Sequence, residues 1–159
     1  MNININISAQ TLDLNDNQGD LVGRYSISSA RNGTGQATGS YCTPLGAHIV
    51  RAKIGGGLPE NTVFVGRRPT GEIYTAELSA RFPNRDWILT RILWLSGCEV
   101  GFNRLGDVDT MRRYIYIHGC PDSVHMGEPG SIGCIRMRNA DIVELFDQIE
   151  PGTPVTIVI

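Results

Sequence analysis

Apolar and polar residues alternate along much of the chain with a period of two, which is typical of β-strands. The first example is at the N-terminus, where Ile3, Ile5 and Ile7 alternate with asparagines. The segment 11–14 repeats the pattern before a polar turn, so the two segments predict a hairpin. Other segments rich in β-branched or aromatic residues between glycines and prolines predict further strands over 21–28, 47–54, 62–65, 72–78, 87–95, 114–117 and 155–159.

One segment has the periodicity of an amphipathic helix. Its apolar face consists of Ile142, Val143, Leu145, Phe146 and Ile149. Asn139 precedes these residues and can cap the helix, and Pro151 and Gly152 end it. Roughly eight or nine short strands with one main helix predict a mostly-β fold, either a sandwich or a barrel.

The composition adds no further element to the predicted fold, but it excludes several classes of protein. With 159 residues, of which 41% are hydrophobic, the chain has the length of one globular domain, 1–159. A net charge of −2 gives no basic surface for nucleic acid. No run of 18 apolar residues predicts a transmembrane helix, and the N-terminus lacks the features of a signal peptide.

The candidate chemistry lies between Tyr114 and Met137, where two histidines and two cysteines occur among glycines and prolines. The first predicted strand of this stretch ends in His118 and Gly119. Cys134 lies sixteen residues after His118, in a glycine-rich turn that leads into a second apolar run. A pair of adjacent strands can therefore bring the thiol and the imidazole together.

On the residues alone, Cys134 is either a nucleophile or a structural cysteine, and His118 is either its base or a hydrogen-bonded core histidine. The hypothesis of a nucleophilic cysteine assigns the following roles. Cys134 is the expected nucleophile, with a pKa below the free-thiol value, and His118 is the expected general base. No carboxylate lies at a suitable place in the motif to orient the imidazole, so the carbonyl of Gly119 is the expected partner. The N–H groups of Gly133 and Cys134 are the expected oxyanion donors. Ser131 is expected to bond the turn with its hydroxyl, and Cys42 and Cys98 are expected to be small buried residues.

A zinc site of His118, Cys120, His125 and Cys134 is the alternative from another class of protein. The ligand types suit zinc, but the spacing lacks the paired knuckles of structural zinc sites. We therefore expect neither a metal nor another cofactor. His48 and His125 are expected at the surface or partly buried.

The same residues resemble a known family. The segment 115–119 (IYIHG), then Gly127 and Pro129, then 131–137 (SIGCIRM) is similar to the signature of the L,D-transpeptidase (YkuD-like) catalytic domains. The similarity extends upstream to 38–48 (TGSYCTPLGAH) and to both ends of the chain.

The resemblance implies a β-rich catalytic fold that acts on the stem peptides of bacterial peptidoglycan through an acyl-thioenzyme, and inhibition by carbapenems. It also implies that Arg136 belongs to the site, on the substrate side or as a residue that orders the loop, and that the protein works at the cell envelope. Because no signal peptide is visible, a cytoplasmic location stays open.

One position departs from the family pattern. Ile132 stands where the family most often has a histidine, so a pseudo-enzyme that holds peptidoglycan without turnover is a third hypothesis. We nevertheless expect an active enzyme, because His118 at the end of a strand can reach the thiol without help from position 132. In that account Ile132 packs against the loop and excludes water.

Overall fold

The computed structural model describes all residues, 1–159, and confirms a mostly-β fold with one main helix after Cys134. The strands are β1 (Asn2–Asn6), β2 (Thr11–Asn15), β3 (Leu21–Ser28), β4 (Gly46–Ile54), β5 (Thr62–Val65), β6 (Arg68–Ile73), β7 (Ile88–Gly97), β8 (Tyr116–Gly119), β9 (Ile135–Met137) and β10 (Pro154–Val158). The helices are α1 (Ala76–Arg81), the 3₁₀ turn η1 (Gly106–Val108) and α2 (Asn139–Gln148).

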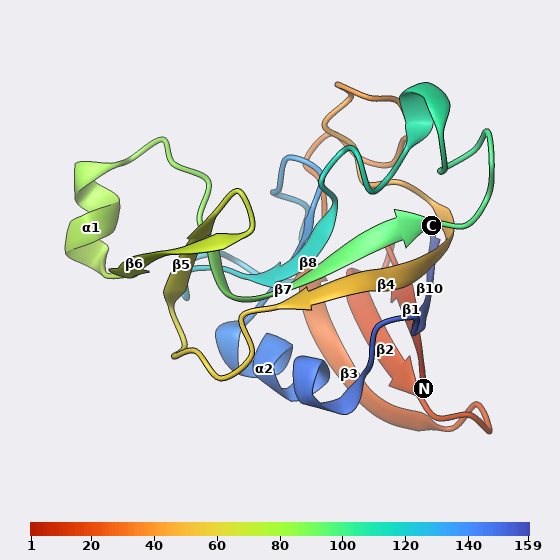
Figure 1. Cartoon of the computed structure of the whole chain (residues 1–159), viewed down its shortest axis with the longest axis horizontal. Helices are drawn as coiled ribbons and strands as arrows, with labels where there is room; N and C mark the ends of the chain where they lie inside the picture. The colour runs from red at the N-terminus through yellow and green to blue at the C-terminus, as the bar shows by residue number, and fades with distance from the viewer.

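The sheet closes on itself. Its strand order is β4-β10-β1-β2-β3-β9-β8-β7-β5-β6, and β4 also pairs with β7, so the strands from β4 to β7 form a barrel. The hairpin of β5 and β6 continues the sheet beyond the barrel and, together with α1, extends to one side of it (Figure 1). Closure satisfies the edges of the barrel strands, which leaves β6 as the free edge.

The barrel encloses the main core. Alternation along β1 and β2 turns Ile3, Ile5, Leu12 and Leu14 inward, where each is fully buried. The apolar face of α2 belongs to the same cluster. A smaller cluster of Phe64, Ile92 and Tyr116 lies apart from this core, where β5, β7 and β8 adjoin, and Cys134 packs against it.

The predicted strand over 72–78 is wrong. In the structure the strand β6 ends at Ile73, and Thr75 begins the short helix α1 by accepting a hydrogen bond from the Leu78 N–H to its Oγ1 at 3.0 Å. A threonine three residues before the bonded N–H is a typical N-cap, and this local signal outweighs the β propensity of Ile73 and Tyr74. The strand over 68–73 was not predicted, because five of its six residues are exposed and it shows no apolar face.

The predicted cap of α2 is also wrong. Arg138 occupies the N-cap position without a side-chain hydrogen bond, and Asn139 is the first helical residue. The Asn139 side chain instead accepts a hydrogen bond from Thr90 at 2.5 Å and donates one to Asn61 at 3.0 Å. Burial of this amide among tertiary partners explains why it does not cap its own helix.

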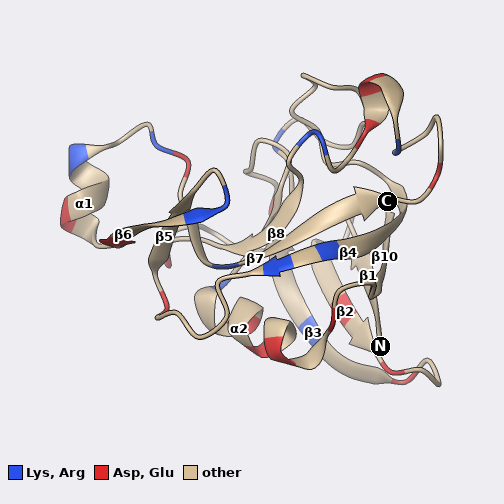
Figure 2. Cartoon of the chain, in the orientation of Figure 1, with Lys and Arg blue, Asp and Glu red and all other residues tan.

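Charged residues of both signs are interspersed along the ribbon (Figure 2). None of the helices has the length and apolar character required to cross a membrane.

Candidate active site

Strands β8 and β9 carry the residues that the sequence singled out. They pair in parallel, with His118 opposite Arg136 and Ile117 opposite Ile135. Ile117 and Ile135 face the barrel core, so alternation directs His118 and Arg136 to the other face. Cys134 directly precedes β9 and packs with the cluster of that outer face. The fold therefore brings His118, Cys134 and Arg136 to one face of two adjacent strands.

The strand that carries His118 begins two residues later than predicted. Tyr114 has a φ of 57°, in the left-handed region, and cannot continue a strand. Its carbonyl oxygen turns toward the Cys134 sulfur, 3.3 Å away. The strained residue thus supplies a hydrogen-bond partner to the thiol.

His118 is fixed in one tautomer. Its side chain is buried, and Nδ1 lies 2.6 Å from the Gly119 carbonyl oxygen. Because a carbonyl only accepts hydrogen bonds, Nδ1 carries the proton and Nε2 presents its lone pair. Burial lowers the pKa of His118, while the Gly119 carbonyl and the charge of Asp86 act in the opposite direction. The imidazole is therefore neutral at pH 7 and able to accept a proton.

Gly119 is required by close packing. A Cβ at this position would collide with Asn139 Oδ1 and would lie 2.7 Å from the Leu89 carbonyl oxygen. Any side chain would displace the carbonyl that holds His118.

The Cys134 thiol is partly buried and rests between two backbone groups. Its sulfur donates to the Tyr114 carbonyl and accepts from the Tyr116 N–H, both at 3.3 Å. Burial raises the pKa of Cys134 to about 12, and the Tyr116 N–H offsets only part of that rise. The predicted lowering of this pKa is therefore wrong. The resting group is the thiol, because desolvation outweighs the nearby hydrogen-bond donor and arginines.

Ser131 orders the turn before the thiol. Its hydroxyl donates to the Cys134 carbonyl at 2.5 Å and accepts from the Gly133 N–H at 3.2 Å. Gly133 has a φ of 137°, and a Cβ there would lie 3.2 Å from the Ile115 side chain. The Gly133 N–H, predicted as an oxyanion donor, is thus occupied by Ser131, whereas the Cys134 N–H remains available.

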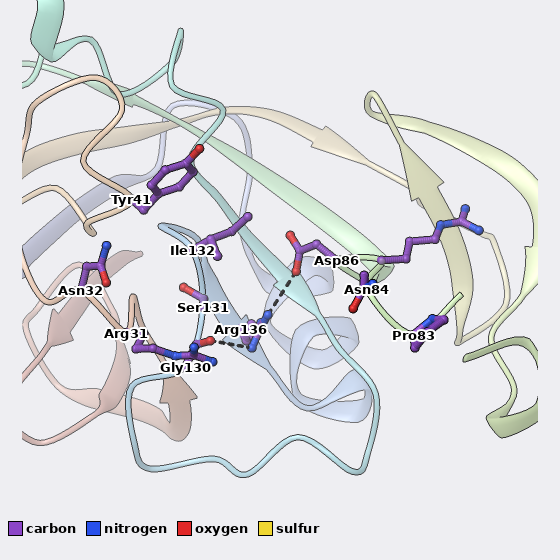
Figure 3. A pocket seen from close by; sticks show the side chains of 11 residues that line it. Arg31, Asn32, Tyr41, Pro83, Asn84, Asp86, Gly130, Ser131, Ile132 and Arg136 are labelled. Atoms are coloured by element: carbon purple, nitrogen blue, oxygen red, sulfur yellow. Dashed lines mark hydrogen bonds and ion pairs between the residues drawn. The ribbon is translucent and has the colours of Figure 1, made fainter. Parts of the chain in front are cut away.

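Arg136 makes contacts on two sides. It donates to the Gly130 carbonyl at 3.2 Å and forms an ion pair with Asp86 at 3.1 Å (Figure 3). Asp86 lies in the loop between α1 and β7, fifty positions away in the chain, and no sequence pattern singles it out. Trp87, the next residue, is buried and holds the end of that loop in place. The sequence pattern predicts Trp87 only as part of a strand.

Arg113 is a second residue that the sequence did not indicate. It donates to the carbonyls of Cys42 at 2.6 Å and Gly35 at 3.2 Å, and so holds the long polar loop over 28–45 against the site. Burial lowers the pKa of Arg113, and proximity to Cys42 and Cys134 acts against that lowering.

Two pockets of about 550 Å³ each open beside the turn. Cys134 lines one of them, the thiol pocket, together with Arg67, Arg113 and Tyr114. The other, the arginine pocket, has a polar lining that includes Arg31, Asn32, Arg85 and Arg136 (Figure 3). Tyr41, Asp86 and Ile132 line both, so the two hollows meet at these residues.

Ile132 does not pack as predicted. Its side chain is 57% exposed and stands at the junction of the two pockets. It therefore presents an apolar surface to any ligand that spans them, rather than sealing the loop against water.

The four residues of the zinc hypothesis do not converge on one point. No group of three or more His, Cys, Asp or Glu side chains converges on a point that could hold a metal ion. Cys120 is buried and its thiol lies 3.3 Å from the Met137 carbonyl, while His125 is exposed.

Three other expectations concern burial. His48 was expected at the surface or partly buried but is almost fully buried, with its ring nitrogens 3.0 Å from the Gly46 carbonyl and from the Thr110 hydroxyl. Cys42 and Cys98 were expected to be buried, but Cys42 is only partly buried and Cys98 is exposed. Cys42 lies in a loop and Cys98 directly after β7, where a single sequence shows no periodic pattern to indicate burial. His48 lies within β4, where its neighbours on the strand did not show which face is buried.

The architecture defines the class: a closed β-barrel domain with a histidine on strand β8 and a cysteine directly before the adjacent strand β9, beside two surface pockets. The family model of the YkuD L,D-transpeptidase catalytic domain matches residues 2–157. The chain therefore belongs to this family. No curated protein gives a significant match.

Solved structures share the fold at low identity. An L,D-transpeptidase in complex with imipenem is 20% identical with a TM-score of 0.57, over 98% of this chain and 57% of that one. L,D-transpeptidase 3 from Mycobacterium tuberculosis with a faropenem-derived adduct is 17% identical with a TM-score of 0.59, over 98% and 58%. A mutant of the Enterococcus faecium L,D-transpeptidase is 18% identical with a TM-score of 0.59, over 99% and 49%. The chain thus spans about half to three fifths of the length of these proteins.

Proposed function

We propose that residues 1–159 form a cysteine-dependent L,D-transpeptidase catalytic domain that cross-links or remodels peptidoglycan stem peptides. The observation that carries this proposal is the position of the Cys134 sulfur at the wall of a pocket, on the same face as a buried neutral His118. The reaction class is acyl transfer through a thioester. Membership of the family supports a role at the cell envelope.

Acylation begins from a thiol and a neutral imidazole. Nε2 of His118 accepts the thiol proton as the sulfur of Cys134 attacks the carbonyl carbon that precedes the terminal D-alanine. The new bond is C–S, and the scissile C–N bond breaks when the imidazolium returns the proton to the leaving amine. Because the resting pKa of Cys134 is about 12, proton transfer accompanies attack instead of preceding it.

The negative charge of the tetrahedral intermediate needs donors. The Cys134 N–H is available for it. The Gly133 N–H can join only if it leaves the Ser131 hydroxyl, so Ser131 serves mainly to order the turn. Arg136 acts beside these groups by holding the Gly130 carbonyl and the Asp86 carboxylate.

Deacylation repeats these steps with a new amine. The side-chain amine of a second stem attacks the thioester, His118 removes its proton, and the thiolate of Cys134 leaves and is reprotonated. The products are a cross-linked peptide and the free enzyme. No step requires a cofactor or a metal.

Two neighbours support covalent chemistry at such a site. They are the avibactam carbamoyl enzyme of one L,D-transpeptidase and the faropenem-derived adduct of another. By analogy we infer that the Cys134 thiol of this chain is open to β-lactams of the carbapenem class.

The test is turnover of a tetrapeptide donor that ends in D-alanine, with a diamino-acid peptide as acceptor. The proposal expects release of D-alanine and formation of a cross-linked product by the wild type, and neither product from Cys134→Ala. Release of D-alanine without a cross-link would indicate a carboxypeptidase. Tight binding of peptidoglycan fragments without any release would support the pseudo-enzyme, the candidate that Ile132 favours.

A further inference from the structure

The arginine pocket has a charge pattern that the catalytic steps above do not use. Three guanidinium groups line it, those of Arg31, Arg85 and Arg136, against a single carboxylate, that of Asp86. Such a lining attracts a small anion, and a planar guanidinium matches a carboxylate in shape.

Two of the three arginines already have partners. Arg85 forms an ion pair with Glu72 at 2.8 Å and stacks on the Trp87 ring at 4.6 Å. Arg136 is paired with Asp86 at 3.1 Å. Arg31 makes no ion pair and no side-chain hydrogen bond, and its side chain is exposed to the pocket. It is therefore the guanidinium that is free to bind a ligand.

The backbone places Arg31 next to the catalytic turn. Its N–H donates to the Ser131 carbonyl at 2.9 Å, and Ala30 forms a β-bridge with Ser131. A ligand group held by Arg31 is thus tied to the turn that carries Cys134. Figure 3 shows Arg31 and Asp86 on opposite sides of Ser131.

The geometry of acyl transfer indicates which part of the substrate binds in the arginine pocket. We assign the acyl chain to the thiol pocket, because Cys134 lines that pocket and not the other. The leaving amine and the incoming amine occupy the same side of the thioester, because deacylation reverses the geometry of acylation. That side is the arginine pocket, which meets the thiol pocket at Ile132. The leaving amine is a terminal D-alanine, which carries a carboxylate next to its nitrogen.

We propose that Arg31 binds the carboxylate next to the reacting nitrogen: first that of the terminal D-alanine of the donor, and then that of any acceptor whose reacting amine has a carboxylate on the adjacent carbon. This inference rests on the proposed function. It assigns a specificity: the site selects substrates with a free carboxylate at this position over the corresponding carboxamides.

The kinetic test compares two donors that differ only at the terminus, a tetrapeptide acid and its carboxamide. We expect the wild type to favour the acid in kcat/KM by about tenfold or more, as for a hydrogen-bonded charge pair. Arg31→Gln should remove that preference by slowing the acid alone, and Arg31→Lys should retain part of it. Arg51→Gln, which removes an exposed arginine of β4 that lines neither pocket, should keep the full preference. An unchanged preference in Arg31→Gln would overturn the inference.

A binding measurement separates this inference from the proposed function. D-alanine and D-alaninamide are titrated by NMR into the Cys134→Ala protein, with and without Arg31→Gln. We expect D-alanine, and not its amide, to shift the amide signals of Arg31, Asn32 and Ser131, with affinity about tenfold weaker after the Arg31 substitution. Equal shifts for the two ligands, or no shift with either, would overturn the carboxylate site. Failure of turnover together with selective D-alanine binding would overturn the transpeptidase proposal and leave the site standing.

Discussion

The Nδ1 atom of His118 lies 2.6 Å from the carbonyl oxygen of Gly119, its immediate neighbour in the chain. A backbone group thus does what a carboxylate does in many catalytic triads: it fixes the tautomer and the ring orientation. Burial lowers the pKa of His118, and the neutral carbonyl of Gly119 counteracts that lowering less than a carboxylate would.

Substitution of His118 tests its role as base. His118→Ala should reduce the rate of acylation on the order of 10²-fold or more, because the thiol then has no proton acceptor. Stopped-flow acylation by a chromogenic cephalosporin or carbapenem measures this rate. Unfolding curves serve as the control, since His118 is buried. A folded His118→Ala protein that acylates at the wild-type rate would exclude His118 as the base.

The resting state of Cys134 predicts an unusual alkylation profile. Because burial raises the pKa of Cys134 to about 12, little thiolate exists at pH 7, and the rate should climb steadily between pH 7 and 10. Iodoacetamide labelling followed by peptide mapping measures it, with the exposed Cys98 as an internal comparison that should react faster at pH 7. A plateau for Cys134 with a midpoint below about 8.5 would indicate a stabilised thiolate instead.

Ile132 is expected to be dispensable for proton transfer. Since isoleucine can neither accept nor donate a proton, an active wild type shows that position 132 is not the base. Ile132→His should change the acylation rate far less than His118→Ala does, because the side chain is 57% exposed at the junction of the pockets. If the wild type is inert and Ile132→His gains acylation, the pseudo-enzyme hypothesis holds and His118 is insufficient.

His48 gives the fold a pH dependence that is separate from catalysis. Burial lowers the pKa of His48 from 6.5 to about 4, so the unfolded chain binds a proton there more readily than the folded one between these values. Stability should therefore fall as the pH drops from about 6.5 to 4, by up to about 3 kcal/mol from this residue. Urea unfolding at several pH values measures this. His48→Gln should flatten the dependence, and an equally steep loss in that variant would contradict the assignment.

The sequence predicted the parts of the molecule that follow local rules. Alternation placed β3, β5 and the two N-terminal strands within a residue of their observed bounds, because one face of each meets the core. The short motif placed His118 at the end of a strand and Cys134 in the turn before an adjacent strand, since strand ends and glycine turns have recognisable local sequences.

The residues that it missed depend on contacts between distant segments. Asp86 reaches Arg136 across fifty positions, and Arg113 reaches Cys42 across seventy-one. The sequence of a loop does not indicate in which direction an arginine or aspartate side chain points. The prediction of a lowered pKa for Cys134 is wrong for the same reason. The burial that raises this pKa comes from residues packed around the thiol, and these are distant from Cys134 in the chain.

Formation of a covalent adduct tests the central claim most directly. The intact protein is incubated with imipenem at pH 7, its mass is measured, and the modified peptide is mapped, with Cys134→Ala as the control. The account predicts one adduct per chain, located on Cys134, and none in the control, although three other cysteines are present. A wild-type protein that stays unmodified, or that carries the adduct on Cys42 or Cys98, would contradict it.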